Sequence, residues 1–402
     1  AGVGYFLNTT GGIITVNLAA GTAGDSVALA DYAGTWQTNN VTVNANGSEK
    51  IGGVVAPATL STQGQSVTFV YIDGTQGWVN VLDSTSNVRG AFQYVTATVS
   101  GACNTLTTSG DYKIAKFVGP GTFCVSCAGS ACGSNTVDYM VVAGGGGTVC
   151  GGCGGSGGGG AGGWRASSGA ASGCYTAGPA PLTGPVSALA VPVAPYPIAV
   201  GGGGTAGNPS PGVTAGGNSI FSSITSTGGG TSNNPTPSAP GGSGGGGASL
   251  GANSGGTGNT PSVSPPQGNN GGLGMANNPG PPSASYRGGG GGGAGGVGTA
   301  GAFPGTGGAG GAGVASHITG SPVGYAGGGG GGAGNEPAGT TAAGGTANPV
   351  GGGGPGGTPG GSGGTAGTVN TGAGAGGGKY PGNSCTGAAG GSGIVIIRYK
   401  YQ

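Results

Sequence analysis

SYRGGGGGGAGGVG, residues 285–298, holds six consecutive glycines in a chain that has 113 glycines among its 402 residues. Such runs usually form flexible linkers, because a residue without a Cβ keeps great backbone freedom. Here the glycine blocks are separated by clusters of Asn, Pro, Ser and Thr at irregular intervals of roughly 12 to 20 residues. This rhythm is typical of regular elements joined by turns, and it favours a folded glycine-rich domain over a tether.

Two regular structures accept this much glycine. Collagen requires glycine strictly at every third position and abundant proline, whereas this chain has glycine in blocks and only 26 prolines. A polyglycine II helix has about three residues per turn and no internal hydrogen bonds, so its amides must pair with neighbouring helices. We therefore predict that residues 144–391 form a bundle of polyglycine II helices with exposed loops and essentially no α-helix.

The beginning of the chain predicts β-structure. Residues 1–100 contain short β-branched runs such as GIITVNL and QSVTFVYID, bounded by Gly, Asn and Asp, which predict a small all-β module. In SVTFVYID both strand faces are partly apolar, so one face is expected to meet another subunit or domain. We therefore interpret this module as an assembly interface.

Apolar strands frame the glycine-rich region on both sides. VDYMVVAG ends at Gly144, and GIVIIRYKY begins at Gly393. We predict that Tyr139–Ala143 and Ile394–Tyr399 pair in one sheet, so that residues 101–143 and 392–402 form a β base around a closed insertion. A flexible tether would require no such pairing.

The charge of the chain argues against nucleic-acid and membrane partners. Charged residues make up 4% of the sequence and the formal net charge is +1, which provides no basic field for phosphates. Residues 188–200, the most apolar stretch that is poor in glycine, are too short and too rich in proline to span a bilayer. The opening residues AGVGYFLNTT lack an initiator Met and a positively charged leader, as expected of a processed chain or a fragment.

Eight cysteines leave three interpretations open. The pairs Cys124–Cys127 and Cys150–Cys153 have C-x2-C spacing and are separated by 22 residues, close to the spacing of a zinc ribbon. The even count also suits disulfides that stabilise a core poor in large side chains, and unpaired core cysteines are the third possibility. We favour at least two disulfides and no bound metal. The candidate residues are Cys103, Cys124, Cys127, Cys132, Cys150, Cys153, Cys174 and Cys385.

Catalytic chemistry lacks the residues that it requires. The single histidine, His317, has no acidic neighbour in the sequence, and Glu336 is the only carboxylate of the glycine-rich region. Neither acid–base nor triad catalysis is therefore expected. The G-x-G-x-x-G matches are inevitable at this glycine content, and none opens a helix after a strand. We predict a non-enzymatic protein without a cofactor, in which His317 lies in a loop.

Aromatic side chains in the turns between the glycine blocks are the candidates for a binding surface. Amphipathic rings among Asn, Ser and Thr can stack on sugar faces and hydrogen-bond hydroxyl groups. The alternative is that the rings seal the edges of the bundle. The candidate receptor-binding residues are Trp164, Tyr175, Tyr196, Phe221, Tyr286, Phe303 and Tyr325.

The stretch GDYKIAKFVGPGTFCVS, followed by VDYMVVAGGGG, GGAGGWR and a final GGSGIVIIRYK, resembles the glycine-rich domains at the ends of bacteriophage tail-fibre and related virion proteins. The preceding TTGGIITVNLAAGTAGDSVALADYAGTW is similar to a small β module of cyanophage and other marine phage structural proteins. The resemblance implies a virion fibre or tip adhesin, often trimeric, whose polyglycine II helices carry variable receptor-binding loops. The many cysteines and the lack of a long shaft depart from this pattern.

Two functions of different classes are compatible with these features. An adhesin at an extracellular or virion surface would bind a host-surface glycan or protein through its loops, and we expect it to self-associate as a homotrimer or filament. Alternatively, the chain is the repeating subunit of an extracellular filament or virion appendage that assembles through sheet edges or donated strands. An ice-binding bundle is a third alternative, which the irregular glycine blocks disfavour.

Overall fold

The computed structural model describes residues 2–84, 93–130, 133–150, 154–183, 186–207, 212–233, 238–250, 254–277, 285–302, 306–334, 351–358, 363–379 and 387–402. Every regular element in these ranges is a β-strand, which confirms the predicted all-β fold. The chain divides into two compact units, Ala1–Ala91 and Phe92–Gln402. The first unit is shorter than the predicted module, because β8 (Val95–Ser100) pairs with β11 (Gly121–Ala128) and belongs to the second unit.

Two sheets form the first unit. One has the strand order β1-β3-β6-β7 and consists of β1 (Val3–Leu7), β3 (Ser26–Asp31), β6 (Ser66–Asp73) and β7 (Gly77–Ser84). The other has the order β2-β4-β5 and consists of β2 (Ile14–Asn17), β4 (Val41–Asn44) and β5 (Ala58–Leu60). The pairs β1–β3 and β2–β4 are parallel, and the remaining pairs are antiparallel. Strands β1 and β2 are therefore edge strands of their sheets.

The core of the first unit takes side chains from both sheets. Leu29 and Phe69 of the first sheet share one buried cluster with Val41 and Val43 of the second, and Trp36 completes it. The unit is therefore a β-sandwich, in which strand alternation directs one apolar set of each sheet inward.

The turn after β3 is organised by the buried carboxylate of Asp31. Its oxygens accept hydrogen bonds from the backbone N–H groups of Gly34, Thr35, Trp36 and Gly64 at 2.9–3.3 Å. Burial by itself would raise the pKa of Asp31, but these hydrogen bonds outweigh burial and hold the pKa below its ordinary value. The charged form of this carboxylate therefore stabilises the fold.

The second unit contains two larger sheets. The central sheet has the order β13-β12-β23-β10-β9, with β14 (Leu189–Ala190) also paired to β12, and consists of β9 (Thr105–Ser109), β10 (Tyr112–Phe117), β12 (Thr136–Val142), β13 (Trp164–Ala166) and β23 (Ile394–Lys400). The outer sheet has the order β17-β16-β15-β11-β8 and adds β15 (Ala194–Ala199), β16 (Ser219–Phe221) and β17 (Ile224–Ser226). Short strands elsewhere are β18 (Met275–Asn277), β19 (Ser285–Arg287), β20 (Val314–Ser316), β21 (Val323–Tyr325) and β22 (Ala333–Gly334).

The central sheet is buried on both faces. Tyr139 and Val141 of β12 lie in the cluster shared with the outer sheet, whereas Met140 and Val142 lie in a second cluster on the opposite face. Burial on both faces explains why VDYMVV and IVIIRY are nearly continuous apolar runs without alternation.

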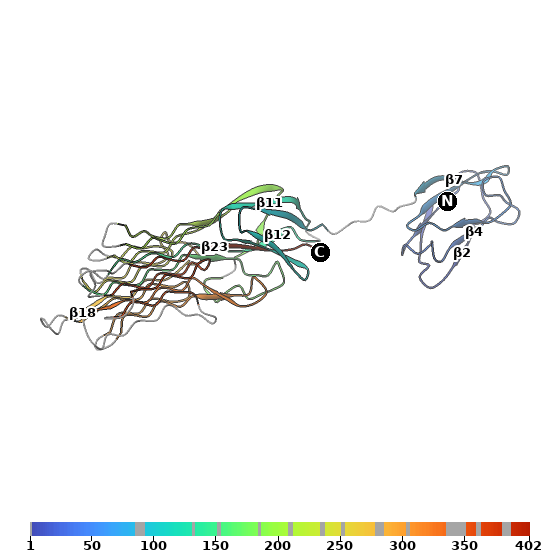
Figure 1. Cartoon of the computed structure of the whole chain (residues 1–402). Helices are drawn as coiled ribbons and strands as arrows, with labels where there is room; N and C mark the ends of the chain where they lie inside the picture. Colours follow the sequence, from blue (N-terminus) through green and yellow to red (C-terminus); the bar gives the residue numbers. More distant parts are fainter. Residues whose placement is uncertain are drawn as a thin grey trace. The chain divides into compact units, whose positions relative to one another are not determined.

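Strands β12 and β23 pair antiparallel, in a register that runs from Val142 opposite Ile394 to Asp138 opposite Arg398. This pairing confirms the prediction for the two apolar strands that frame the glycine-rich region. The glycine-rich chain therefore leaves and re-enters the base through neighbouring strands, and Figure 1 shows its segments lying side by side beyond β12 and β23.

The hydrogen bonds of the glycine-rich segments repeat every three residues. In the segment 143–149, successive N–H groups donate to three different segments in turn: Ala143 and Gly146 to 154–163, Gly144 and Gly147 to 212–218, and Gly145 and Thr148 to 387–393. The carbonyl groups of residues 144–148 accept from three further segments, namely 201–207, 226–232 and 372–379. Each direction around the segment thus faces a different neighbour, and six neighbours surround it.

Backbones that approach this closely leave no room for a Cβ. A Cβ added to Gly159 would lie well inside 3.0 Å of the Gly146 carbonyl oxygen, and one added to Gly291 would meet the Gly159 carbonyl oxygen in the same way. Real Cβ atoms essentially never come so close to backbone atoms. The long glycine runs are therefore a steric requirement of packing between segments, and in this fold they do not act as a tether.

Candidate functional sites

Three of the aromatic residues predicted to bind a receptor are buried. Trp164 and Phe221 are 0% exposed and Tyr325 is 3% exposed. The rings of Trp164 and Tyr325 pack together with centroids 6.0 Å apart, and burial raises the pKa of Tyr325 to about 12. Phe221 packs edge-on against Phe123 in the opposite core. These three rings lie in the two cores on either face of the central sheet and are not available to a receptor, which corrects the prediction for them.

Tyr175 and Tyr196 are half-buried and make contacts within the base. The ring of Tyr175 faces the Arg398 guanidinium at 5.3 Å from its centroid, and burial raises the pKa of its hydroxyl above the ordinary value. The hydroxyl of Tyr196 donates to the Pro192 carbonyl at 3.0 Å, and its ring packs against Phe221. Both residues therefore make packing contacts within the second unit, whereas the alternative interpretation of the aromatic set placed such rings at the edges of the bundle.

Tyr286 is the predicted candidate that lies on the glycine-rich bundle itself, whereas Phe303 lies outside the described residues. Tyr286 is partly exposed in β19 and lies opposite Ala276 of β18. Leu273, on the chain that leads into β18, is 58% exposed, and Met275, the first residue of β18, is 45% exposed. We call Leu273, Met275 and Tyr286 the far-end group, because β18 lies at the end of the bundle remote from β23 (Figure 1).

The far-end group was detectable in part from the sequence. In GGLGMAN, residues 271–277, two large apolar side chains alternate with glycine inside a block where packing between segments favours glycine. A large side chain in such a block is sterically possible only where it points out of the bundle. The side chains of Leu273 and Met275 therefore mark the face of their segment that points out of the bundle.

A buried polar cluster connects the two central strands to the loop that follows β13. Asp138 is 0% exposed and accepts hydrogen bonds from Ser167 Oγ and from the backbone N–H and Oγ of Ser172, each at 2.7 Å. Arg398, which lies opposite Asp138, donates from Nε to the Ser172 carbonyl and from a terminal nitrogen to the Ile318 carbonyl. Both charged groups are hydrogen-bonded within the protein, so the cluster joins the paired strands β12 and β23 to the loops that hold Ser172 and Ile318.

His317 lies in the turn between β20 and β21, as predicted, and its backbone N–H donates to the Thr176 carbonyl at 2.9 Å. Its Nδ1 is buried and makes no hydrogen bond to the described part of the chain. Among the described residues, no three His, Cys, Asp or Glu side chains lie close enough together to hold a metal ion.

The described cysteines test some of the candidates for the predicted disulfides. Four described cysteines are free: Cys103, Cys124, Cys127 and Cys174. Cys150 is disulfide-bonded, and Cys132, Cys153 and Cys385 lie outside the described residues. Cys103, Cys124, Cys127 and Cys174 are therefore not the disulfide residues that the sequence suggested. The count of at least two disulfides stays a prediction, because Cys132, Cys153 and Cys385 are also among the candidates. Cys124 is exposed because side chains alternate along β11, so that it points outward between the buried side chains of Phe123 and Val125.

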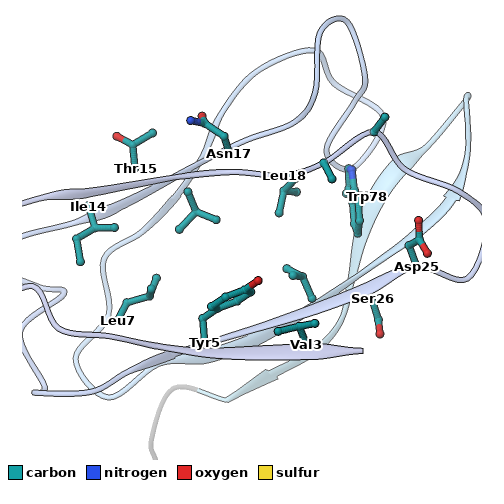
Figure 2. Close-up of a pocket in the computed structure, with 14 residues that line it drawn as sticks. Val3, Tyr5, Leu7, Ile14, Thr15, Asn17, Leu18, Asp25, Ser26 and Trp78 are labelled. Atoms are coloured by element: carbon teal, nitrogen blue, oxygen red, sulfur yellow. The ribbon is translucent and has the colours of Figure 1, made fainter. Parts of the chain in front are cut away.

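The first unit contains a cavity of about 490 Å³ between its two sheets. Figure 2 shows Val3, Tyr5 and Leu7 of β1 along one side of this cavity, with Ile14 and Leu18 opposite them. Most of the lining is apolar, and the cavity lies between the inward-facing side chains of the edge strands β1 and β2. The two sheets of the sandwich are therefore incompletely closed along this edge.

Comparison with known proteins adds one finding. A family model described as a glycine-rich domain matches residues 118–400, which include the glycine-rich segments and most strands of the base. No curated protein matches the chain. None of the described residues forms a helix of the length and apolar character needed to cross a membrane.

Proposed function

The chain belongs to the glycine-rich domain family, whose model matches its residues 118–400, and from this premise we propose that it is a non-enzymatic virion fibre or tail-tip adhesin. In this proposal the protein acts at an extracellular or virion surface. The base carries the bundle, and the bundle presents side chains to a glycan or protein on a host surface. The resemblance to phage tail-fibre and marine phage structural proteins supports the same class.

The glycine-rich segments are polyglycine II helices in this proposal. Support comes from the three-residue repeat of the hydrogen bonds around residues 143–149 and from the six neighbouring segments. An experimental structure checks this inference through the backbone dihedrals of residues 143–149 and 154–163. Values near φ of about −75° and ψ of about +145° are expected, and α-helical or ordinary antiparallel β values would contradict it.

One observation carries the proposal of a display scaffold. The interior of the bundle is held by hydrogen bonds between backbone groups of segments far apart in the sequence, and these bonds do not depend on which side chains lie at the far end. Such a scaffold tolerates changes in its outward-pointing residues without loss of the fold. This independence is what a surface that must match variable receptors requires.

The far-end group is the part of the described surface that we assign to recognition. Leu273 and Met275 present apolar side chains to solvent, and Tyr286 supplies an amphipathic ring of the kind that binds sugar faces and protein surfaces. The bundle itself supplies little charge, since charged residues make up only 4% of the chain. Recognition through this group would therefore depend on apolar contact and neutral hydrogen bonds.

Adsorption of the purified full chain to a panel of bacterial cells and to an array of cell-surface glycans tests the proposal. We expect the variants Leu273→Ser with Met275→Ser, and separately Tyr286→Ala, to lower adsorption at least about tenfold without a change in the melting temperature. Val369→Ser is the matched control, because Val369 is 66% exposed and follows a segment that ends next to the base. Unchanged adsorption by the far-end variants, or equal loss in the control, would contradict the assignment.

A self-assembling filament subunit is the second candidate function. The observation that favours it is the exposed apolar edge of the first unit, where Phe6 is 77% exposed. Electron microscopy of native material distinguishes the two functions, because continuous filaments support the second candidate and capped spikes support the first.

A further inference from the structure

Strand β1 is an unprotected sheet edge. It pairs with β3, and no other described strand pairs with it. Its five residues, VGYFL, include no charged residue and no proline, which are devices that normally prevent edge strands from pairing with another chain. Its apolar side chains are also accessible, since Val3 is 46% exposed, Tyr5 49% and Phe6 77%.

The outer face of the same sheet has a shallow hollow of about 190 Å³ next to Phe6. Gly4, Ala28 and Ala30 line the hollow, and it exists because these positions carry little or no side chain. A Cβ placed on Gly4 would meet only the Ala28 Cβ, at 3.9 Å, so the space above Gly4 is open. The strand thus carries an exposed aromatic ring and an open space two residues apart.

We propose that β1 pairs antiparallel with β1 of a second copy of this chain, about a two-fold axis that passes next to Tyr5. In this register Tyr5 faces the partner's Tyr5, Val3 faces the partner's Leu7, and Gly4 faces the partner's Phe6. Each Phe6 ring then lies over the glycine of the other copy and enters its hollow. An aromatic side chain across from an edge glycine is a favourable cross-strand pair.

The backbone groups agree with this register. The Leu7 carbonyl accepts a hydrogen bond from the Tyr32 N–H at 3.1 Å, so it points toward the β3 side of the strand. Because successive residues of a strand direct these groups to opposite sides, Gly4 and Phe6 direct theirs to the free edge. In the proposed pair, Gly4 and the partner's Phe6 exchange two N–H···O hydrogen bonds, and the two Tyr5 residues form the closer, non-hydrogen-bonded pair.

A second copy fits this edge because the edge is self-complementary. The occupant must be an uncharged strand with an aromatic residue two positions from a glycine, and VGYFL meets both conditions. No like charges oppose each other when the strand meets itself. The pairing also covers Val3, Tyr5 and Leu7 along the open side of the cavity in Figure 2. The contact is closed by its two-fold symmetry, and the inference is independent of the proposed adhesion.

Sedimentation velocity of the full chain up to about 200 µM tests the proposal, with a monomer–dimer equilibrium in the micromolar range expected for an interface of this limited size. Phe6→Lys places a charge opposite the hollow, and Gly4→Leu fills the hollow. We expect each variant to weaken the dimer at least tenfold. Leu82→Lys is the control, because Leu82 is 66% exposed on β7, the other edge of the same sheet. Near-ultraviolet circular dichroism checks that all variants remain folded.

A cross-linking experiment tests the register separately. In a background where Cys103, Cys124, Cys127 and Cys174 are replaced by Ser, Tyr5→Cys is expected to form a disulfide with its copy on mild oxidation. The two residues form a non-hydrogen-bonded pair, whose Cβ atoms lie at the close end of the cross-strand range, about 4.5 Å apart, and a disulfide joins Cβ atoms up to about 4.5 Å apart. Phe6→Cys serves as the off-register control. A wild-type chain that stays monomeric, a dimer that survives Phe6→Lys, or a trimer would each overturn the proposal. A wild-type chain that dimerises through β1 but adsorbs to no cell or glycan would count against the adhesin function alone.

Discussion

The role of a single glycine depends on what lies beyond its missing Cβ. Gly202 and Gly203 are adjacent in one segment, yet a Cβ on Gly202 would meet nothing within 4 Å, whereas a Cβ on Gly203 would collide with the Gly390 carbonyl oxygen. The obstacle at Gly203 is backbone, which cannot rotate away as a flexible side chain can. Two glycines with the same sequence context thus differ in whether the fold requires them.

We expect Gly203→Ala to destabilise the protein by about 3 kcal/mol, because the two segments must separate to admit the methyl group. Gly202→Ala is the matched control and is expected to be neutral or to stabilise by about 0.4–1 kcal/mol, since alanine restricts the unfolded chain more than glycine does. Chemical denaturation of both variants measures the difference. Equal stability would show that the segment tolerates a Cβ at Gly203.

Asp31 connects the stability of the first unit to pH. The pKa of Asp31 is held below its ordinary value in the folded state. The charged carboxylate therefore adds to the free energy of unfolding in full at pH values above the unfolded pKa of about 3.9. This stabilisation is lost as pH falls through the folded pKa. We expect Asp31→Asn to lower stability at pH 7 by about 2 kcal/mol, because a charged acceptor of four N–H groups is lost. The variant should also reduce the loss of stability on acidification.

Thermal unfolding at pH 7 and pH 3, followed by tryptophan fluorescence, checks this expectation. The control is Asp73→Asn, whose carboxylate is exposed and accepts hydrogen bonds from Thr75 and Gln76. A larger effect of the control than of Asp31→Asn would contradict the role given to the buried carboxylate.

Among the strands, β12 and β23 carry the connection between base and bundle. Their side chains enter one core on each face of the central sheet, so a change in either strand affects both cores. Ile394 and Ile396 are 1% and 0% exposed and lie in the same buried cluster as Met140 and Val142. The burial of each side chain contributes roughly 1.5–3 kcal/mol to the free energy of unfolding. Both residues lie where the glycine-rich chain returns to the central sheet.

We expect Ile396→Asp to abolish soluble, protease-resistant second unit, because the substitution places an unpaired charge in a fully buried position. Val193→Asp introduces the same residue at a position that is 62% exposed and should leave protease resistance unchanged. Limited proteolysis followed by mass spectrometry of residues 93–402 distinguishes the two. A folded Ile396→Asp variant would show that the central pair of strands is dispensable.

The whole molecule is stabilised with very few charges. The chain has 9 basic and 8 acidic residues among 402, and the glycine-rich region is held by hydrogen bonds between neutral backbone groups. Salt screens interactions between exposed charges but has little effect on such bonds. Stability should therefore be nearly independent of ionic strength.

We expect the melting temperature of the full chain to change by less than about 3 °C between low salt and 1 M NaCl, where the Debye length is only about 3 Å. Differential scanning calorimetry measures this directly, and the Asp31→Asn variant shows how much of any change comes from that carboxylate. A shift of 10 °C or more would mean that ion pairs contribute substantially to the fold.

Several features of the molecule were predictable from local sequence. Short β-branched runs indicated strands, and the apolar character of VDYMVVAG and GIVIIRYKY indicated two strands of one sheet, which pair as predicted. The position of His317 in a turn also followed from its neighbours. These features depend on side-chain pattern along a few consecutive residues, which a single sequence records.

Other features depended on contacts between distant segments. Trp164, Phe221 and Tyr286 all neighbour turns or glycine blocks, yet two are buried in the base and one is partly exposed on the bundle. The free state of Cys124 and the end of the first unit at Ala91 were likewise not predictable. Glycine has no side chain whose periodicity could mark an inner and an outer face, so the neighbours of each segment are chosen by backbone hydrogen bonds that form only when all segments are in place.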